Sequence, residues 1–129
     1  MQRFVELYVF LGFLVVGISH ITMAAAWDEF FALLRSKGRA GVIANGMLAL
    51  AFGSIVVVGH NIWSGLALIV TLIGWAQLVK AFLHLTIPGI GERSLQMAET
   101  NPLTKFRLGG AVMLIVDIPV AYLVFSPQT

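Results

Sequence analysis

The polar side chains that could do chemistry in this chain include Gln77, Lys80 and His84, which interrupt a long apolar stretch at intervals of three and four residues. On an α-helix, residues at this spacing share one face. An amide, an ammonium group and an imidazole on one face can bind a polar ligand, relay a proton or hydrogen-bond a neighbouring helix. Such groups are costly against lipid, so this face must meet protein or water.

Each of the other three long apolar stretches carries a further polar residue away from its ends. A helix rises about 1.5 Å per residue, so the depth of each side chain can be counted from the end of its stretch that borders the basic loops. All of these side chains then lie in the half near the basic loops or at the centre of the stretch. The opposite half is almost entirely apolar. The sequence therefore predicts a polar pocket that opens toward the basic loops, with candidate residues His20, Asn45, Gln77, Lys80, His84 and Asp117.

Lys80 and Asp117 carry the charge in this predicted pocket. Lys80 can either extend its long stem to the headgroups or pair with Asp117. Asp117 lies near the middle of its stretch and must be protonated or meet a cation, and Lys80 is the leading candidate. A pair would either fix the register of the helices or form a site that responds to protons or a ligand.

The remaining polar residues have structural interpretations. We expect His20 and His84 to be hydrogen-bonded histidines at helix ends, because the chain has no cysteine and no HxxxH or ExxH pair for a metal or haem. Asn45 should bond between helices. Glu6 and His60 lie near the ends of their stretches, so we expect them to be solvated. We predict no catalytic residue, metal or cofactor.

The composition indicates the elements that must position these residues. Of the 129 residues, 59% are hydrophobic and 11% charged, which is too apolar for a soluble domain. We predict one all-α domain over residues 1–129, an integral membrane four-helix bundle with a short interfacial helix over 27–39 between the first two helices. The net charge of +2 gives no reason to expect nucleic acid. The predicted spans are about 4–26, 41–59, 63–87 and 106–125.

The connections between the spans predict an orientation. Residues 60–62 form a short turn between the second and third spans, and residues 88–91 end the third span before a polar loop with one helical turn near 94–97. Loops 27–40 and 88–105 hold or border most basic residues, so both should be cytoplasmic and both termini outside, in a bacterial inner membrane. These basic residues are Arg35, Lys37, Arg39, Arg93, Lys105 and Arg107.

The two halves of the chain share a pattern. Each is a span, a polar connection and a second span, and His20-Ile21-Thr22 and His84-Leu85-Thr86 occupy matching places. A duplication would give two parallel halves related by a pseudo-two-fold axis along the membrane normal. Chance similarity between two apolar helices is the alternative.

The segment Leu11-Gly-Phe-Leu-Val-Val-Gly-Ile-Ser-His20, followed by an interfacial aromatic segment and three more spans, resembles the DoxX-like group of small four-helix membrane proteins. The resemblance covers most of the chain and implies the same architecture. Some members of that group are linked to redox partners or quinone-dependent complexes, and no catalytic residue carries over. Small multidrug transporters are also four-helix proteins of this length, but they depend on a glutamate embedded in the first helix, and Glu6 is too near the end for that role.

We therefore predict a small non-enzymatic integral membrane protein, an accessory or partner-binding subunit in a homo-oligomer or a larger membrane complex, with a polar pocket in the cytoplasmic half. The alternative is a transporter or channel for protons or a small solute that uses Lys80 and Asp117. A third possibility is a membrane enzyme that acts on a lipid or quinone held in the pocket. No nucleophile stands at a suitable spacing for that chemistry.

Overall fold

A computed structural model describes residues 1–127, and the fold of this part of the chain is built from helices without any β-strand. Four of the helices are long and apolar enough to cross a membrane. The all-α prediction is confirmed, and so is the number of long apolar helices. The elements are α1 (Gln2–Thr22), α2 (Ala24–Ser36), α3 (Arg39–Gly59), α4 (Ala67–Thr86), α5 (Pro88–Met97) and α6 (Pro102–Phe125).

Two short helices, α2 and α5, connect the long ones. The first span was predicted to reach residue 26, but the helix breaks at Met23 and α2 begins at Ala24, so this predicted end is wrong. The polar segment after the third span was predicted as a loop, yet it forms α5 with Pro88 in its first turn. Proline is well suited to this position, because its missing N–H would have no helical partner there.

The connection between α3 and α4 is longer than predicted. Helix α4 begins at Ala67 rather than at residue 63. The hydroxyl of Thr71 holds the connection in place: its oxygen accepts the Ile62 N–H at 2.9 Å and its proton is donated to the Ile62 carbonyl at 2.8 Å. These bonds satisfy backbone groups that would otherwise lack helical partners.

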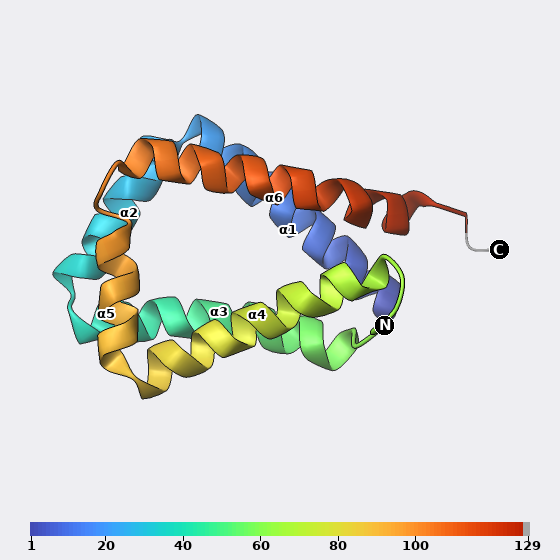
Figure 1. The fold of residues 1–129 in the computed structure, drawn as a ribbon, viewed down its shortest axis with the longest axis horizontal. Coiled ribbons are helices and arrows are strands. Elements are labelled where there is room, and N and C mark those ends of the chain that lie inside the picture. Colours follow the sequence, from blue (N-terminus) through green and yellow to red (C-terminus); the bar gives the residue numbers. More distant parts are fainter. Residues whose placement is uncertain (128–129) are drawn as a thin grey trace.

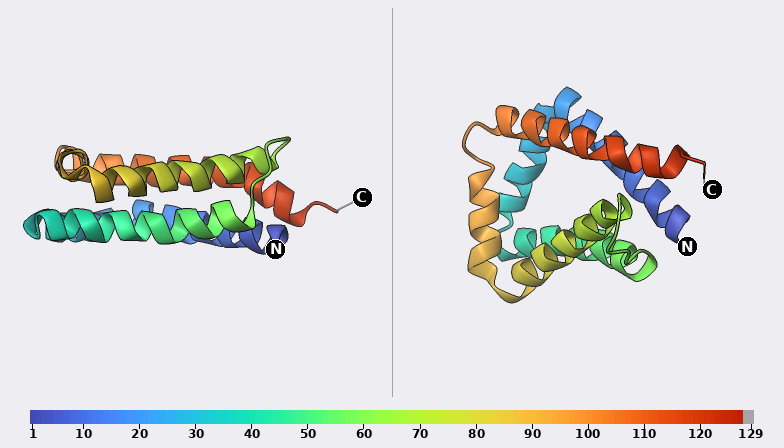
Figure 2. Two further views of the ribbon diagram at one scale, coloured as in Figure 1. Left: turned by 90° about the horizontal axis from the view of Figure 1, so that it is seen from below. Right: turned by 45° about the vertical axis from the view of Figure 1, so that its right-hand side comes forward.

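The molecule consists of two stacked halves, each with a long, a short and a long helix (Figures 1 and 2). Helices α1, α2 and α3 form one layer, and α4, α5 and α6 form the other. Across the layers α1 packs on α6 and α3 packs on α4. The N-terminus, the end of α6 and the α3–α4 connection lie at one end, while α2 and α5 lie at the other (Figure 1).

The contacts of the two halves match, which favours a duplication over chance similarity. A Cβ added to Gly46 would lie 3.0 Å from the Cβ of His84, and one added to Gly110 would lie 2.8 Å from the Cβ of His20. The spacing that relates His20 to His84 also relates Gly46 to Gly110. Each half therefore places its histidine against a glycine of the partner helix, and α1 and α4 both run from the end that holds the N-terminus toward the end that holds α2 and α5 (Figure 1).

The core is divided between the two ends of the molecule. The larger cluster lies at the end that holds the N-terminus and consists of Val5, Val9, Val56, Val70, Val120 and Val124. A smaller cluster at the other end joins α2, α3 and α5 through Leu34, Val42 and Leu95. The space between the two clusters contains the candidate site.

Candidate binding site

A cavity of about 370 Å³ lies where α1, α3, α4 and α6 meet. Asn45 of α3 and Gln77 and Lys80 of α4 line it, so three of the six predicted pocket residues are brought together. The rest of the lining is largely apolar and includes Tyr8 and Phe52. A mostly apolar cavity with a few convergent polar groups is the usual form of a small-molecule site.

Close packing of α3 on α4 sets the positions of these polar groups. Asn45, Ala49 and Gly53 recur every four residues, so they share the face of α3 that meets α4. A Cβ on Gly53 would lie 2.8 Å from the backbone nitrogen of Leu78 and 3.0 Å from the Cβ of Gln77. Only glycine permits this approach, which fixes Gln77 at the cavity wall.

The three polar groups of the cavity are not engaged by the protein. Asn45 is buried, and Gln77 and Lys80 are half-buried. Within residues 1–127, none of the side-chain hydrogen bonds or ion pairs uses the two amides or the ammonium group. Their donors are available to a molecule that enters the cavity.

Asp117 does not pair with Lys80, so the predicted leading partner is wrong. The ion pairs within residues 1–127 join Asp28 to Arg35, Arg39 to Glu92, and Glu6 to His60. Asp117 is 3% exposed, its Oδ1 has no hydrogen-bond partner, and it is absent from the cavity lining. Helix α6 reaches the cavity through Met113, which lies one turn before Asp117.

His20 and His84 lie outside the cavity and bond to their own helices. The Nδ1 of His20 is 2.8 Å from the carbonyl of Val16, and the Nδ1 of His84 is 2.9 Å from the carbonyl of Lys80. The His20 ring also stacks on Trp27 with centroids 4.2 Å apart. The expectation of hydrogen-bonded histidines near helix ends is confirmed. In the described part of the chain, no group of three or more His, Cys, Asp or Glu side chains could hold a metal ion.

The repeat relates the polar wall of the cavity to an apolar one. At the spacing that relates the two histidines, the equivalents of Gln77 and Lys80 are Phe13 and Val16, which line the same cavity from α1. Each half has one of these histidines, and each histidine packs against a glycine of the partner helix. The cavity amides and ammonium belong to one half only, so the cavity has a polar side on α3 and α4 and an apolar side on α1 and α6.

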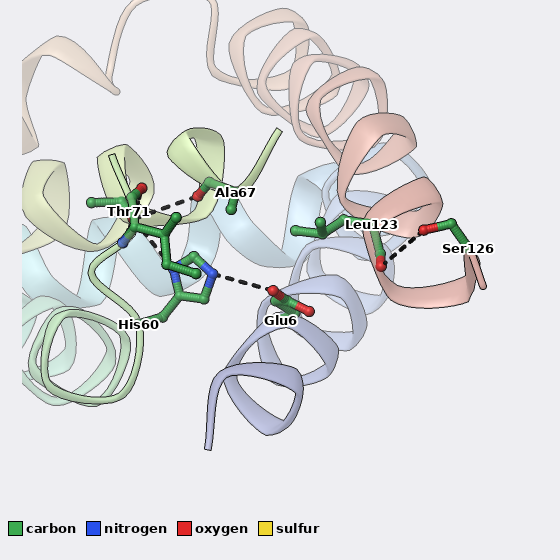
Figure 3. Close-up of polar contacts among 7 residues, drawn as sticks. Glu6, His60, Ala67, Thr71, Leu123 and Ser126 are labelled. Carbon is green, nitrogen blue, oxygen red and sulfur yellow. Dashed lines mark hydrogen bonds and ion pairs between the residues drawn. The ribbon is translucent and has the colours of Figure 1, made fainter. Parts of the chain in front are cut away.

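Sequence reasoning missed a second polar group, at the end near the N-terminus (Figure 3). Glu6 and His60 were expected to be solvated, but they are 4% and 1% exposed, so this expectation is wrong. The Nε2 of His60 lies 3.3 Å from Oε1 of Glu6, and its Nδ1 lies 3.2 Å from Oγ1 of Thr71. The sequence signal that could have indicated this cluster was Thr71, a polar residue in the first turns of an apolar helix that follows the turn with His60.

Thr71 and Glu6 contact the two nitrogens of the His60 ring. The hydroxyl of Thr71 donates to the Ile62 carbonyl and lies within hydrogen-bond distance of His60 Nδ1. The other ring nitrogen lies within hydrogen-bond distance of Glu6 Oε1. The cluster therefore links α1 to the α3–α4 connection and to α4.

A larger cavity, of about 570 Å³, lies between α2, α3 and α5. Its charged residues include Arg35, Glu92 and Glu99, which have both signs. Glu92 and Glu99 are exposed, and Glu92 lies 3.9 Å from Arg39. Because its charges are partly paired or solvated, this cavity makes a weaker candidate than the one that holds Lys80.

The chain was also compared with known proteins. It matches no protein-family model, no curated protein and no solved structure.

Proposed function

We propose that the chain is a small non-enzymatic integral membrane protein that serves as an accessory or partner-binding subunit and binds a guest molecule in the cavity beside Asn45, Gln77 and Lys80. The observation that supports this proposal most directly is the cavity itself, because the amides of Asn45 and Gln77 and the ammonium group of Lys80 have no partner within residues 1–127. Four long apolar helices support insertion in a bilayer. The resemblance of the sequence to the DoxX-like group of small four-helix membrane proteins is part of the basis of this proposal.

The chemistry of the lining favours binding over catalysis. Two amides and an ammonium group can position a guest, but no serine, threonine or cysteine lines the cavity to act as a nucleophile. Thr71 does lie beside His60, yet it is 0% exposed and its oxygen already serves the Ile62 backbone. A substrate could not reach this hydroxyl without breaking the α3–α4 connection.

The distribution of charge supports an orientation in the membrane. Most basic residues lie on or next to α2 and α5, so we place that end in the cytoplasm and both termini outside, in a bacterial inner membrane. Large apolar side chains are exposed along all four long helices, including Val15, Leu48, Phe82 and Ile115. This surface suits lipid, a second copy or another membrane subunit.

Proton or small-solute transport is the second candidate. The favouring observation is Asp117, a buried carboxyl group in a long apolar helix with one oxygen unpartnered. The valine cluster weighs against it, because it separates the cavity from the end that holds the N-terminus with tightly buried apolar side chains.

A matched pair of glycine substitutions tests the binding role. Gly12 lines the cavity, and an added Cβ would meet only Phe52 at 3.8 Å, so Gly12→Leu should fill the cavity without a clash. Gly109→Leu is the control, since no atom lies within 4 Å of its added Cβ. We expect Gly12→Leu to weaken binding of dodecanol and dodecanoate in phosphatidylcholine nanodiscs at least tenfold, and Gly109→Leu to leave binding unchanged.

Two results would count against this proposal. Equal binding by both variants would mean that the cavity is not the binding site. In vesicles with a pH-sensitive dye inside, proton flux that the wild type supports and Asp117→Asn abolishes would favour transport instead.

A further inference from the structure

We propose that the guest of this cavity is a single-chain amphiphile with one anionic head group, held by Lys80, Asn45 and Gln77. This inference rests on the proposed function and adds the chemical class of the ligand. Lys80 is the only charged residue in the cavity lining, and it has no carboxylate within ion-pair distance in residues 1–127. The cavity therefore offers one positive charge without a counterion.

The polar side of the cavity suits a carboxylate or phosphate oxygen. An ammonium group supplies up to three N–H donors and each amide supplies two. Gln77 and Lys80 are neighbours on one face of α4, and Asn45 approaches from α3. Hydrogen bonds between a charged donor and an anionic oxygen are about twice as strong as neutral ones, and a low-dielectric surrounding strengthens them further.

The opposite side of the cavity suits an apolar chain. Phe13 and Val16 replace Gln77 and Lys80 in the other half, Met113 joins them from α6, and the rings of Tyr8 on α1 and Phe52 on α3 add further apolar surface. A volume of about 370 Å³ is near the lower end of ordinary ligand sites, at roughly 300–1,000 Å³. This space favours one chain over the two chains of an intact phospholipid.

The guest can enter from the side. Leu48 lines the cavity and is 59% exposed on the outer face of α3, so the cavity is not sealed there. In a bilayer this face meets lipid chains, where a single-chain acid or a lysophospholipid is dissolved. Both sources have the same chemistry, a single chain with one anionic head.

The test compares four probes in nanodiscs of phosphatidylcholine, with empty nanodiscs subtracted: dodecanoate, lauroyl-lysophosphatidylglycerol, methyl dodecanoate and dodecyltrimethylammonium. We expect at least one of the anionic probes to bind ten times or more tightly than the ester and the cation. Lys80→Met should remove this preference, Lys80→Arg should keep most of it, and Lys37→Met, at an exposed lysine outside the cavity, should not change it. The tighter of the two anionic probes identifies the source of the guest.

Two outcomes would overturn the inference, and they are distinguishable. If the ester binds as tightly as both anions, or if Lys80→Met keeps the preference for the anion, the head group is not read by Lys80. If Gly12→Leu still weakens binding in that case, the cavity remains a binding site and only the anionic class is wrong. If no probe binds, or if Gly12→Leu weakens none of them, the proposed function fails as well.

Discussion

At the scale of single residues, the buried pair of Glu6 and His60 joins α1 to the connection between α3 and α4. Glu6 lies on α1 and His60 directly follows α3, and Thr71 contacts the other ring nitrogen of the imidazole (Figure 3). Arg3 adds a second link, because its guanidinium donates to the carbonyl of Val124 at 2.8 Å, at the end of α6. A basic group is favourable at a helix C-terminus.

Removing one member of the buried pair should destabilise the fold more than replacing it with a neutral isostere. We expect Glu6→Ala to lower the free energy of unfolding by about 2–4 kcal/mol, because His60 is left buried without its partner. Glu6→Gln keeps a hydrogen-bonding amide and should cost less. Thermal unfolding in detergent micelles measures both, and a double-mutant cycle with His60→Ala should give a coupling of about 1–3 kcal/mol.

If the losses of unfolding free energy in Glu6→Ala and His60→Ala are additive in that cycle, the two side chains do not interact directly. The exposed acid Glu99 supplies the control, and Glu99→Ala should stay within about 0.5 kcal/mol of the wild type.

At the scale of elements, the pairing of α1 with α6 depends on two glycines that face each other. An added Cβ at Gly110 would lie 2.5 Å from the carbonyl oxygen of Gly17. In the other half, Gly46 plays the matching part against α4, where the nearest atoms are side-chain carbons of His84 and Leu85 at 3.0–3.2 Å. Small residues let helices approach closely where lipid gives no hydrophobic drive for association.

Adjacent glycines on α6 give a controlled test of this packing. Gly110→Ala should lower the free energy of unfolding by about 1–3 kcal/mol, because the new methyl group meets backbone that cannot move aside. Gly109→Ala meets open space and should be neutral or slightly stabilising, since alanine favours helix. Gly46→Ala should fall between them. Equal effects of the two α6 variants on thermal unfolding would contradict the assigned packing.

At the scale of the whole molecule, the two-layer arrangement places all connections at two ends. The short helices α2 and α5 lie at the end rich in basic residues, and the N-terminus, the end of α6 and the α3–α4 connection lie at the other (Figures 1 and 2). If the four long helices cross a membrane, these two ends must face opposite sides of the bilayer.

Labelling of single cysteines checks this orientation. The chain has no cysteine, so Ser36→Cys at the end of α2 and Ser64→Cys in the α3–α4 connection introduce unique thiols at exposed positions. We expect a membrane-impermeant maleimide to label position 64 in intact cells and position 36 only after the cells are broken. The reverse pattern would invert the orientation, and labelling of both positions in intact cells would contradict a spanning arrangement.

The sequence by itself determined the elements. Composition required helices, and the face shared by Gln77 and Lys80 followed from their spacing, because a helix repeats every 3.6 residues whatever it packs against. The sequence also predicted the end of the third span before Pro88, because a proline disfavours helix at the residue before it. The match between His20 and His84 was visible in the chain, and it anticipated the two-half architecture.

Only the tertiary structure decided which faces meet. The periodicity of α1 gives no indication that Glu6 would meet His60, fifty-four residues away, so the burial of both depends on how α1 packs beside the α3–α4 connection. Packing between helices also left Asp117 away from the cavity and without Lys80. Spacing fixes the direction of a side chain from its own helix, while its partner is fixed by packing between helices, and the sequence pattern does not encode this.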